Sequence, residues 1–422
     1  MKILHTSDWH LGQLFYGKSR EQEQASFLRW LVEQVRLHQI DAVLVVGDIF
    51  DTGTPPSYAR ALYNQFIVRL HQECPTCQLV LLAGNHDSVA VLNESKGLLN
   101  ALNTQVIAGA DPESLDDGTD DLASEHLRDV LIALTDAKQK PAAVLCAIPF
   151  LRPSDLMRSR SDQSAEQRQQ QLTQQIQGYY RQLFDLANKH YPELPVVMTG
   201  HLTTVGASTS ESVKDIYIGT LDAFPANAFP PADYIALGHI HRPQKVAKTE
   251  HIRYCGSPMA LSFDELGREK EVLIVELQPE LGFVKAESLT VPVFQPLIRL
   301  SGSLSDIETQ LSDLSDETAK LASGQTLWVE INVQTEDYLA DLQPRIEALI
   351  GEQPVEVLRI RRENRARSTL ADHKPSVQLD ELTPEEVFLK RLSQEELDED
   401  RRSALIDCFQ QIQSGMQEES AQ

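Results

Sequence analysis

Aspartate, asparagine and histidine recur in five short motifs in the first 241 residues of the chain. The motifs are D-x-H at Asp8 and His10, G-D-x-x-D at 47–51, G-N-H-D at 84–87, G-H at 200–201 and G-H-x-H at 238–241. Oxygen and imidazole ligands suit Mn²⁺, Fe²⁺ or Zn²⁺, and a set without thiolates argues against a purely structural zinc site. One such motif is weak evidence, but five in one order indicate a metal centre.

Asp48 is the central candidate in this set. It follows the apolar run at 43–46 (VLVV) and a glycine, and we expect that glycine to let the chain turn sharply where the strand ends. A carboxylate can bridge two cations about 3.5–4 Å apart, the separation typical of two-metal phosphoester hydrolases. The spacing therefore predicts Asp48 as a ligand shared by two metals.

The elements that carry the first three motifs alternate between strand and helix. Apolar periodicity predicts strands at 2–7, 42–46 and 78–83 and helices at 20–38 and 57–72. This order favours parallel strands with helices on the faces of the sheet. In such sheets functional groups lie beyond the carboxyl ends of the strands, where Asp8, Asp48 and Asn85 fall.

The remainder of residues 1–290 predicts a second sheet. We expect a helix at 161–190 and strands at 128–134, 142–148, 195–199 and 233–237. We also expect antiparallel strands that complete this second sheet, at 252–255, 271–277 and 282–289. The predicted fold class is α/β, with a two-sheet sandwich flanked by helices.

A proline-rich boundary at 291–296 (VPVFQP) begins a smaller α+β domain at 291–360. We expect helices in it at 304–322 and 338–350, and strands at 297–300, 326–333 and 355–360. The domain carries no cluster of catalytic residue types. It either positions substrate or a partner, or it only packs against the first domain.

The C-terminal part is polar and predicts a linker at 361–378. This linker begins with Arg361, Arg362, Arg365 and Arg367, which are either a solvated charge run or a phosphate contact. Residues 379–422 predict two short helices with apolar faces, which include Val387, Phe388, Leu392, Leu405 and Phe409. Helices this short are marginal alone, so they either fold back or dock on a partner, and the linker favours docking.

Length and composition limit the number of domains and the class of protein. A chain of 422 residues predicts two or three domains, and no apolar run approaches the length of a membrane helix. Five cysteines and an N-terminus without a signal-peptide pattern fit a reducing cytoplasm, and the Cys74-x-x-Cys77 pair lacks the second pair that a zinc site needs.

The net charge of −24 argues against a nucleic-acid binder. Two considerations weaken that inference, because bound cations add local positive charge and a partner chain could supply the phosphate-binding surface. The acidity is also uneven, since part of it lies in the loop at 111–121 (DPESLDDGTDD) and in the last 40 or so residues.

The motif set resembles the calcineurin-like metallophosphoesterase superfamily. Longer stretches resemble its double-strand-break repair nucleases, namely 215–224 (DIYIGTLDAF), 236–244 (ALGHIHRPQ) and 254–265 (YCGSPMALSFDE). The resemblance is strong over most of residues 1–290 and rests on architecture beyond them. It implies a four-layer sandwich, a DNA-capping role for 291–360 and partner docking by 379–422.

The resemblance also implies roles for individual residues. One metal would be held by Asp8, His10, Asp48 and His241, and the second by Asp48, Asn85, His201 and His239. His86 would face the scissile phosphate and stabilise the transition state or protonate the leaving oxygen. Distant repair relatives have histidine where this chain has Asp51, which instead matches the phosphatase branch. We therefore predict that Asp51 orients His86 and raises its basicity, so that Asp51→Asn slows turnover without emptying the metal site.

The function implied is that of a Mn²⁺-dependent DNA nuclease chain that opens hairpins and acts as a 3′–5′ exonuclease and single-strand endonuclease. Mg²⁺ or another divalent ion could replace Mn²⁺. The family works with a large coiled-coil ATPase, as a homodimer within a heterotetramer, at the nucleoid. This chain has no G-x-x-x-x-G-K-[ST] loop, so ATP would be bound by the partner. Two alternatives stay open: a phosphoesterase on a small nucleotide, lipid or phosphoprotein, and a non-catalytic scaffold.

Overall fold

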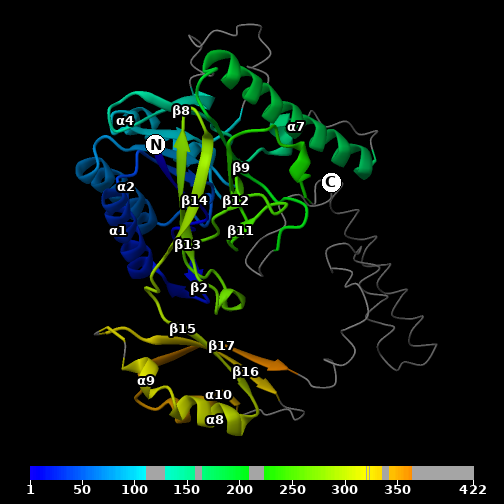
Figure 1. Cartoon of the computed structure of the whole chain (residues 1–422). Helices are drawn as coiled ribbons and strands as arrows, with labels where there is room; N and C mark the ends of the chain where they lie inside the picture. The colour runs from blue at the N-terminus through cyan, green and yellow to red at the C-terminus, as the bar shows by residue number, and fades with distance from the viewer. Residues whose placement is uncertain are drawn as a thin grey trace, which may run out of the picture. The chain divides into compact units, whose positions relative to one another are not determined.

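The computed structural model describes residues 1–110, 129–156, 164–208, 223–319, 321–322, 324–334 and 342–363 (Figure 1). Four features named above lie outside the described residues: the acidic loop at 111–121, most of the stretch at 215–224, the linker beyond residue 363 and the segment 379–422 with all its predicted docking residues. Among the described helices, none combines the length and apolarity required to cross a membrane.

The first sheet has six strands in the order β14-β13-β1-β4-β5-β6. Four of them run parallel, namely β1 (Lys2–Thr6), β4 (Ala42–Val46), β5 (Gln78–Leu82) and β6 (Thr104–Ile107). The other two are β13 (Glu271–Gln278) and β14 (Gly282–Thr290), which pair antiparallel along the other edge of β1. The prediction that these two strands complete the second sheet was wrong, since β13 pairs with β1 and β14 with β13 in the first sheet.

Helices α1 (Glu21–His38) and α2 (Ser57–Glu73) cover the outer face of this sheet. Their buried residues recur at helical spacing, as predicted, with Phe27, Leu31 and Val35 on α1 packing beside Phe66 of α2. Two short helices, α3 (Val89–Asn93) and α4 (Lys96–Asn100), lead into β6 and were not predicted.

The second sheet also has six strands, in the order β11-β12-β10-β9-β8-β7. They are β7 (Leu131–Thr135), β8 (Pro141–Cys146), β9 (Val196–His201), β10 (Tyr234–Gly238), β11 (Gln244–Lys245) and β12 (Ile252–Tyr254). The long helix α7 (Ala165–His190) covers its outer face and begins at a capping box formed by Ser164 and Gln167. The short helix α6 (Pro153–Leu156) precedes it.

The inner faces of the two sheets pack on each other through a third apolar cluster, which includes Ile3, Leu44 and Val46 from one sheet and Val197 and Ala236 from the other. Central strands such as β4 are therefore buried on both faces, which explains their unbroken apolar sequence. The result is a helix-sheet-sheet-helix sandwich, visible in Figure 1 between α1 and α7, and the predicted fold class is confirmed.

The smaller domain has a sheet in the order β15-β16-β17, formed by β15 (Leu297–Gly302), β16 (Leu327–Gln334) and β17 (Val355–Glu363). One face packs on α8 (Leu304–Ser312) and α10 (Leu342–Ile350). The single helix predicted at 304–322 is divided into α8 and α9 (Ser315–Thr318). Strand β17 continues to Glu363, so Arg361 and Arg362 belong to the sheet and not to the predicted linker.

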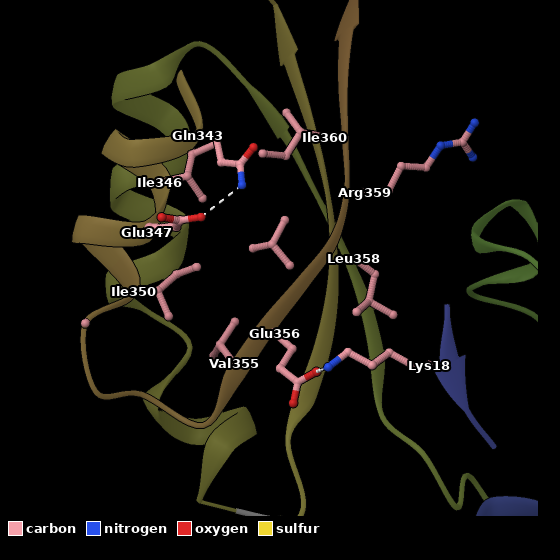
Figure 2. Close-up of a pocket in the computed structure, with 12 residues that line it drawn as sticks. Lys18, Gln343, Ile346, Glu347, Ile350, Val355, Glu356, Leu358, Arg359 and Ile360 are labelled. Carbon is pink, nitrogen blue, oxygen red and sulfur yellow. Dashed lines mark hydrogen bonds and ion pairs between the residues drawn. The ribbon is translucent and has the colours of Figure 1, made fainter. Parts of the chain in front are cut away.

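A small hairpin of the sandwich contacts this domain. It is formed by β2 (Leu14–Phe15) and β3 (Lys18–Ser19), shortly after the D-x-H motif at Asp8 and His10. The Phe15 ring stacks on Trp328 with centroids 5.7 Å apart. Figure 2 shows Lys18 reaching Glu356 of β17 in an ion pair beside a 660 Å³ pocket between α10 and β17.

Candidate metal centre

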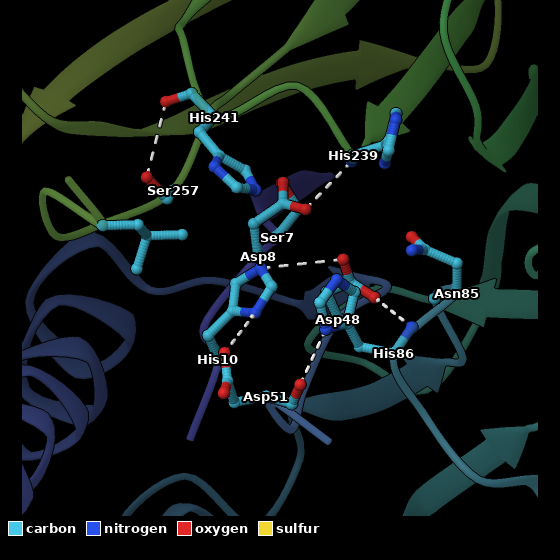
Figure 3. A network of polar contacts seen from close by, with 12 residues as sticks. Ser7, Asp8, His10, Asp48, Asp51, Asn85, His86, His239, His241 and Ser257 are labelled. Carbon is cyan, nitrogen blue, oxygen red and sulfur yellow. Dashed lines mark hydrogen bonds and ion pairs between the residues drawn. The ribbon is translucent and has the colours of Figure 1, made fainter. Parts of the chain in front are cut away.

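The seven predicted metal ligands come from the ends of five strands and meet at one edge of the sandwich (Figure 3). Asp8, His10 and His241 form one group whose ligand atoms lie within 4.8 Å of one another. Asp48, His201 and His239 form a second group of the same kind. Each group contains three members of one predicted ligand set, and a third group of the same kind joins His10, Asp48 and His86.

Asp48 lies between the two groups. Its Oδ2 atom is 3.6 Å from His10 Nε2 and 3.3 Å from His201 Nε2. Its other oxygen, Oδ1, accepts a hydrogen bond of 2.9 Å from the main-chain N–H of His86. One carboxylate therefore reaches both groups, which is the arrangement that a bridging ligand requires.

Asn85 adds an amide oxygen to the second group. Its Oδ1 atom is 3.0 Å from His201 Nε2. The other ring nitrogen of His201, Nδ1, lies 3.0 Å from the main-chain oxygen of Val46, which can only accept a hydrogen bond. The Nδ1 atom therefore carries the hydrogen, and Nε2 is the ring atom that a cation would bind.

The donors fit a pair of divalent cations. His10 Nε2 is buried and makes no hydrogen bond to any described residue. A buried polar atom without a partner is costly, and a cation would satisfy this one. Carboxylate, amide and imidazole donors suit Mn²⁺, Fe²⁺ or Zn²⁺, as the sequence indicated.

The main chain is unusual at four of the predicted ligands. Asp8 (φ 54°), His10 (φ 46°), Asp48 (φ 48°) and His239 (φ 89°) all have positive φ. Residues with a Cβ atom rarely adopt this conformation, and the cost is accepted mainly at functional sites. Because φ cannot be read from residue type, this feature was not predictable from the sequence.

The glycines of the motifs act in two different ways. Gly47 has the positive φ (86°) of a sharp turn, but Gly84 and Gly238 do not. A Cβ atom on Gly84 would lie 2.1 Å from Asp48 Oδ1, and one on Gly238 would lie 1.9 Å from the Val46 oxygen. These two glycines are needed because the strand ends approach each other too closely for any side chain.

Charge in the site is balanced by neighbouring groups. Burial alone would raise the pKa of the Asp48 carboxyl, but His201 and His10 hold it well below its usual range. Burial opposes protonation of His201, but Asp48 raises the pKa of that imidazole to about 9. Burial and the neighbouring His201 hold the pKa of His239 well below its usual range. Cation binding at neutral pH would therefore release a proton from His201.

Asp51 reaches two histidines through different atoms. Its carboxylate Oδ1 atom lies 3.2 Å from His10 Nδ1, and its main-chain oxygen lies 2.6 Å from His86 Nδ1 (Figure 3). The Asp51 carboxylate therefore contacts His10, a predicted metal ligand. A contact that orients His86 comes from the main-chain oxygen of Asp51. A carbonyl can only accept, so Nδ1 of His86 carries a hydrogen and Nε2 is the ring nitrogen left to face another group. The His86 ring also packs edge-to-face on His10, with centroids 4.8 Å apart.

Sequence reasoning missed Asp87, the last residue of G-N-H-D. Its carboxylate accepts hydrogen bonds from the main-chain N–H groups of Ile49 (3.1 Å), Phe50 (2.9 Å) and Gly84 (2.8 Å). Burial, with Asp48 nearby, raises the pKa of Asp87 to about 6. Asp87 ties the loop after β4 to the loop after β5, so it fixes Asp48 relative to Asn85. Its place inside a quoted motif was the available signal.

A second missed group lies behind His241. Glu265 Oε1 is 3.5 Å from His241 Nδ1, and Glu265 Oε2 is 2.6 Å from Lys270 Nζ. Burial would raise the pKa of Glu265, but His241 and Lys270 hold it well below its usual range, so the carboxylate stays charged. Glu265 ends the quoted stretch 254–265, but the resemblance gave it no role.

Comparisons with known proteins show the family to which the chain belongs. A family model described as calcineurin-like phosphoesterase matches residues 1–243, and one described as type 5 capsule protein repressor C-terminal domain matches residues 293–396. The chain is 49% identical over 415 residues to SbcD, the nuclease subunit of SbcCD, from Escherichia coli (strain K12), with 97% of each chain covered. It is 31% identical to the SbcD protein of Rhodobacter capsulatus, covering 92% of this chain and 93% of the relative. The SbcD protein of Bacillus subtilis is 28% identical over 81% of each chain.

Proposed function

The chain belongs to the calcineurin-like phosphoesterases and, among them, to the SbcD family of SbcCD nuclease subunits, and we propose that it hydrolyses DNA phosphodiester bonds with two Mn²⁺ ions. The observation that carries the proposal is the position of Asp48 Oδ2, 3.6 Å from a ligand atom of one group and 3.3 Å from a ligand atom of the other. When bound, two cations supply Lewis-acid activation and neutralise the charge that develops on the phosphate.

The residues of the chain divide the remaining work. Asp8, His10, Asp48 and His241 would hold one cation, and Asp48, Asn85, His201 and His239 the other. His86 would present Nε2 to the scissile phosphate, with its ring held by the Asp51 carbonyl at 2.6 Å. There it would donate a hydrogen bond to the phosphate or a proton to the leaving oxygen. His86 also lies within ligand distance of His10 and Asp48, so its exclusion from the ligand set is part of the proposal.

A DNA substrate is supported by an arginine cluster on the face of the small sheet opposite α8 and α10. Arg299, Arg359 and Arg361 surround the buried Glu330 carboxylate, with nitrogen–oxygen distances of 2.5, 3.4 and 3.7 Å. Each arginine side chain is between 30% and 34% exposed, so the guanidinium groups can still reach solvent or a ligand. Guanidinium groups in a fixed array bind phosphates well.

This arginine cluster contacts the hairpin that follows the D-x-H motif in the sequence. Arg359 donates a 2.9 Å hydrogen bond to the hydroxyl of Tyr16, whose ring lies under the guanidinium at 5.2 Å. Tyr16 is at the tip of the β2–β3 hairpin, six residues after His10. We propose that residues 291–363 cap the DNA by contacting its backbone with this face, which eases the objection raised by a net charge of −24.

We further propose that the chain works with the large coiled-coil ATPase of SbcCD, as a homodimer within a heterotetramer that acts on DNA at the nucleoid. The relatives are named as subunits of the SbcCD complex, which supports a partner of this kind. Docking by residues 379–422, through Val387, Phe388, Leu392, Leu405 and Phe409, is proposed from the apolar pattern of the sequence.

One experiment tests these proposals together. Hairpin DNA and blunt duplex DNA are digested with Mn²⁺, with and without the ATPase partner and ATP, by the wild-type chain, by His86→Ala and by a chain lacking residues 379–422. We expect His86→Ala to cleave about 10²–10⁴-fold more slowly while binding the same amount of Mn²⁺. We expect the shortened chain to keep its own cleavage and lose the response to the ATPase.

Two results would contradict the proposal. If the wild-type chain cleaves no DNA under any condition but hydrolyses a small phosphodiester, the small-substrate alternative is right. If neither substrate is hydrolysed although two ions bind, the chain is a scaffold.

A further inference from the structure

Three buried polar or charged side chains, beginning with His241, contact one another in a row that leads away from the metal centre. The imidazole Nδ1 atom of His241 faces Glu265 Oε1 at 3.5 Å, and Glu265 Oε2 faces Lys270 Nζ at 2.6 Å. The Glu265 side chain is 5% exposed and that of Lys270 is 11% exposed. Both are therefore held inside the protein next to a residue that we propose as a ligand.

The Glu265 carboxylate cannot turn without loss of several contacts. Its Oε2 atom also accepts from the main-chain N–H of Leu261 (3.1 Å) and from the hydroxyl of Ser257 (3.4 Å). Lys270 Nζ in turn donates to Ser257 Oγ (2.9 Å) and to the main-chain oxygen of His241 (3.2 Å). Lys270 therefore fixes both the carboxylate and the backbone of the proposed ligand.

The two oxygens of Glu265 face different groups. One lies against the imidazole of His241 and the other against the ammonium group, so the carboxylate is held in a second layer around the site. A carboxylate accepts, so it favours the tautomer of His241 in which Nδ1 carries the hydrogen and Nε2 can bind a cation. The positive charge of Lys270 also offsets the cost of burying a carboxylate here.

We infer that Glu265 and Lys270 are positioning residues that fix the tautomer and orientation of His241, and so set the affinity for the cation held with Asp8 and His10. This inference rests on the proposed metal centre, because His241 must be a ligand for it to hold. It extends the site by two residues that neither the motif set nor the comparisons assign.

The test measures metal binding in the full-length chain without substrate. Mn²⁺ is titrated into metal-free wild type, Glu265→Gln, Lys270→Gln and His241→Ala, with calorimetry for the dissociation constants and electron paramagnetic resonance for the spin-coupled pair of ions. We expect both positioning variants to bind one of the two ions about 10–100-fold more weakly, with the other ion unaffected. At Mn²⁺ concentrations that fill both sites of the wild type, their spectra should then show isolated Mn²⁺ in place of the coupled pair.

Glu23→Gln is the matched control. Glu23 is also buried (8% exposed) and pairs with Arg20 at 2.7 Å in the same domain, but in the described part of the chain it makes no hydrogen bond or ion pair to a proposed ligand. We expect it to lower the melting temperature of the metal-free protein without changing either dissociation constant. Circular dichroism on every variant checks that the fold is intact.

The outcomes separate the two levels of inference. If His241→Ala binds both ions as the wild type does, His241 is not a ligand and the proposed metal centre is wrong. If His241→Ala loses one ion but both positioning variants stay within twofold of wild type, the role of Glu265 and Lys270 alone is overturned. That role is also overturned if Glu23→Gln weakens Mn²⁺ binding as much as Glu265→Gln, because loss of stability would then explain the effect.

Discussion

The metal centre of the sandwich and the arginine cluster of the small sheet differ in how their buried carboxylates are surrounded. In the metal centre each buried carboxylate meets histidine, lysine or main-chain N–H groups. Asp87, for example, accepts from three N–H groups, and Glu265 from Lys270 and its neighbours. In the small sheet the buried carboxylate of Glu330 faces three guanidinium groups.

This difference shows how one chain can separate chemistry from binding. Groups that must hold a fixed geometry are immobilised by local partners, so the protein gains a preorganised site. In the arginine cluster three guanidinium groups share the carboxylate of Glu330, so positive charge outweighs negative charge among these four side chains. That excess suits long-range attraction to a phosphate backbone, which does not depend on exact geometry.

Removal of the shared ligand should have the largest effect on the metal centre. Asp48→Ala should release both cations, because the Asp48 carboxylate reaches both ligand groups. We expect cleavage to fall by at least about 10³-fold, since metal activation contributes several kcal/mol. Mn²⁺ content measured by mass spectrometry should fall with it, while duplex affinity measured without metal stays close to that of wild type. Loss of only one ion would show that Asp48 does not bridge.

Neutralising the arginine cluster should have the complementary, smaller effect. The triple variant Arg299→Gln, Arg359→Gln and Arg361→Gln should bind duplex DNA more weakly, with the slope of log affinity against log salt reduced by about 0.9 for each lost phosphate contact. Fluorescence anisotropy across a salt series measures this slope. Hydrolysis of a small phosphodiester should be unchanged, because none of these arginines belongs to the proposed metal centre.

A control triple removes the same charge elsewhere, at Arg69→Gln, Arg181→Gln and Lys285→Gln. These cations lie on the surface of the sandwich, where each is paired with a carboxylate. If the control loses as much affinity as the arginine-cluster variant, net charge alone explains the effect and the small sheet has no special role.

Much of the fold and of the metal centre could be predicted from the sequence. The alternation of strands and helices predicted the sandwich, and the polar residues after each strand predicted which side chains would meet. Both inferences depend on local periodicity and on the rule that parallel strands end at one edge. The arrangement of residues 271–290 could not be predicted, because which edge of which sheet a hairpin joins depends on tertiary pairing.

The residues that support the predicted ligands from behind, such as Glu265 and Lys270, could not be predicted from the sequence either. Lys270 is one of the 38 lysines and arginines, and its residue type does not show that it is buried against Glu265. The sequence placed Arg361 and Arg362 in a linker. A run of arginines that ends a strand cannot be told by its composition from a run in a solvent-exposed linker. Their position on β17 follows from pairing with β16, which brings Arg361 beside Glu330.

The smallest expected effect concerns Asp51. From the sequence we expected Asp51→Asn to slow turnover and leave the metal site intact, with the carboxylate acting on His86. The structure places the carboxylate 3.2 Å from His10 Nδ1 and gives a His86 contact to the main-chain oxygen, which the substitution retains. Asparagine can still accept from His10, but without the negative charge that strengthens the imidazole as a donor to the cation.

We therefore expect Asp51→Asn to weaken Mn²⁺ binding up to about 10-fold and to leave kcat at saturating Mn²⁺ within about threefold of wild type. Kinetics over a Mn²⁺ series, beside calorimetry, separates the two quantities. A lower kcat with unchanged Mn²⁺ affinity would instead support the expectation from the sequence, in which the Asp51 side chain acts on the proton-transfer residue.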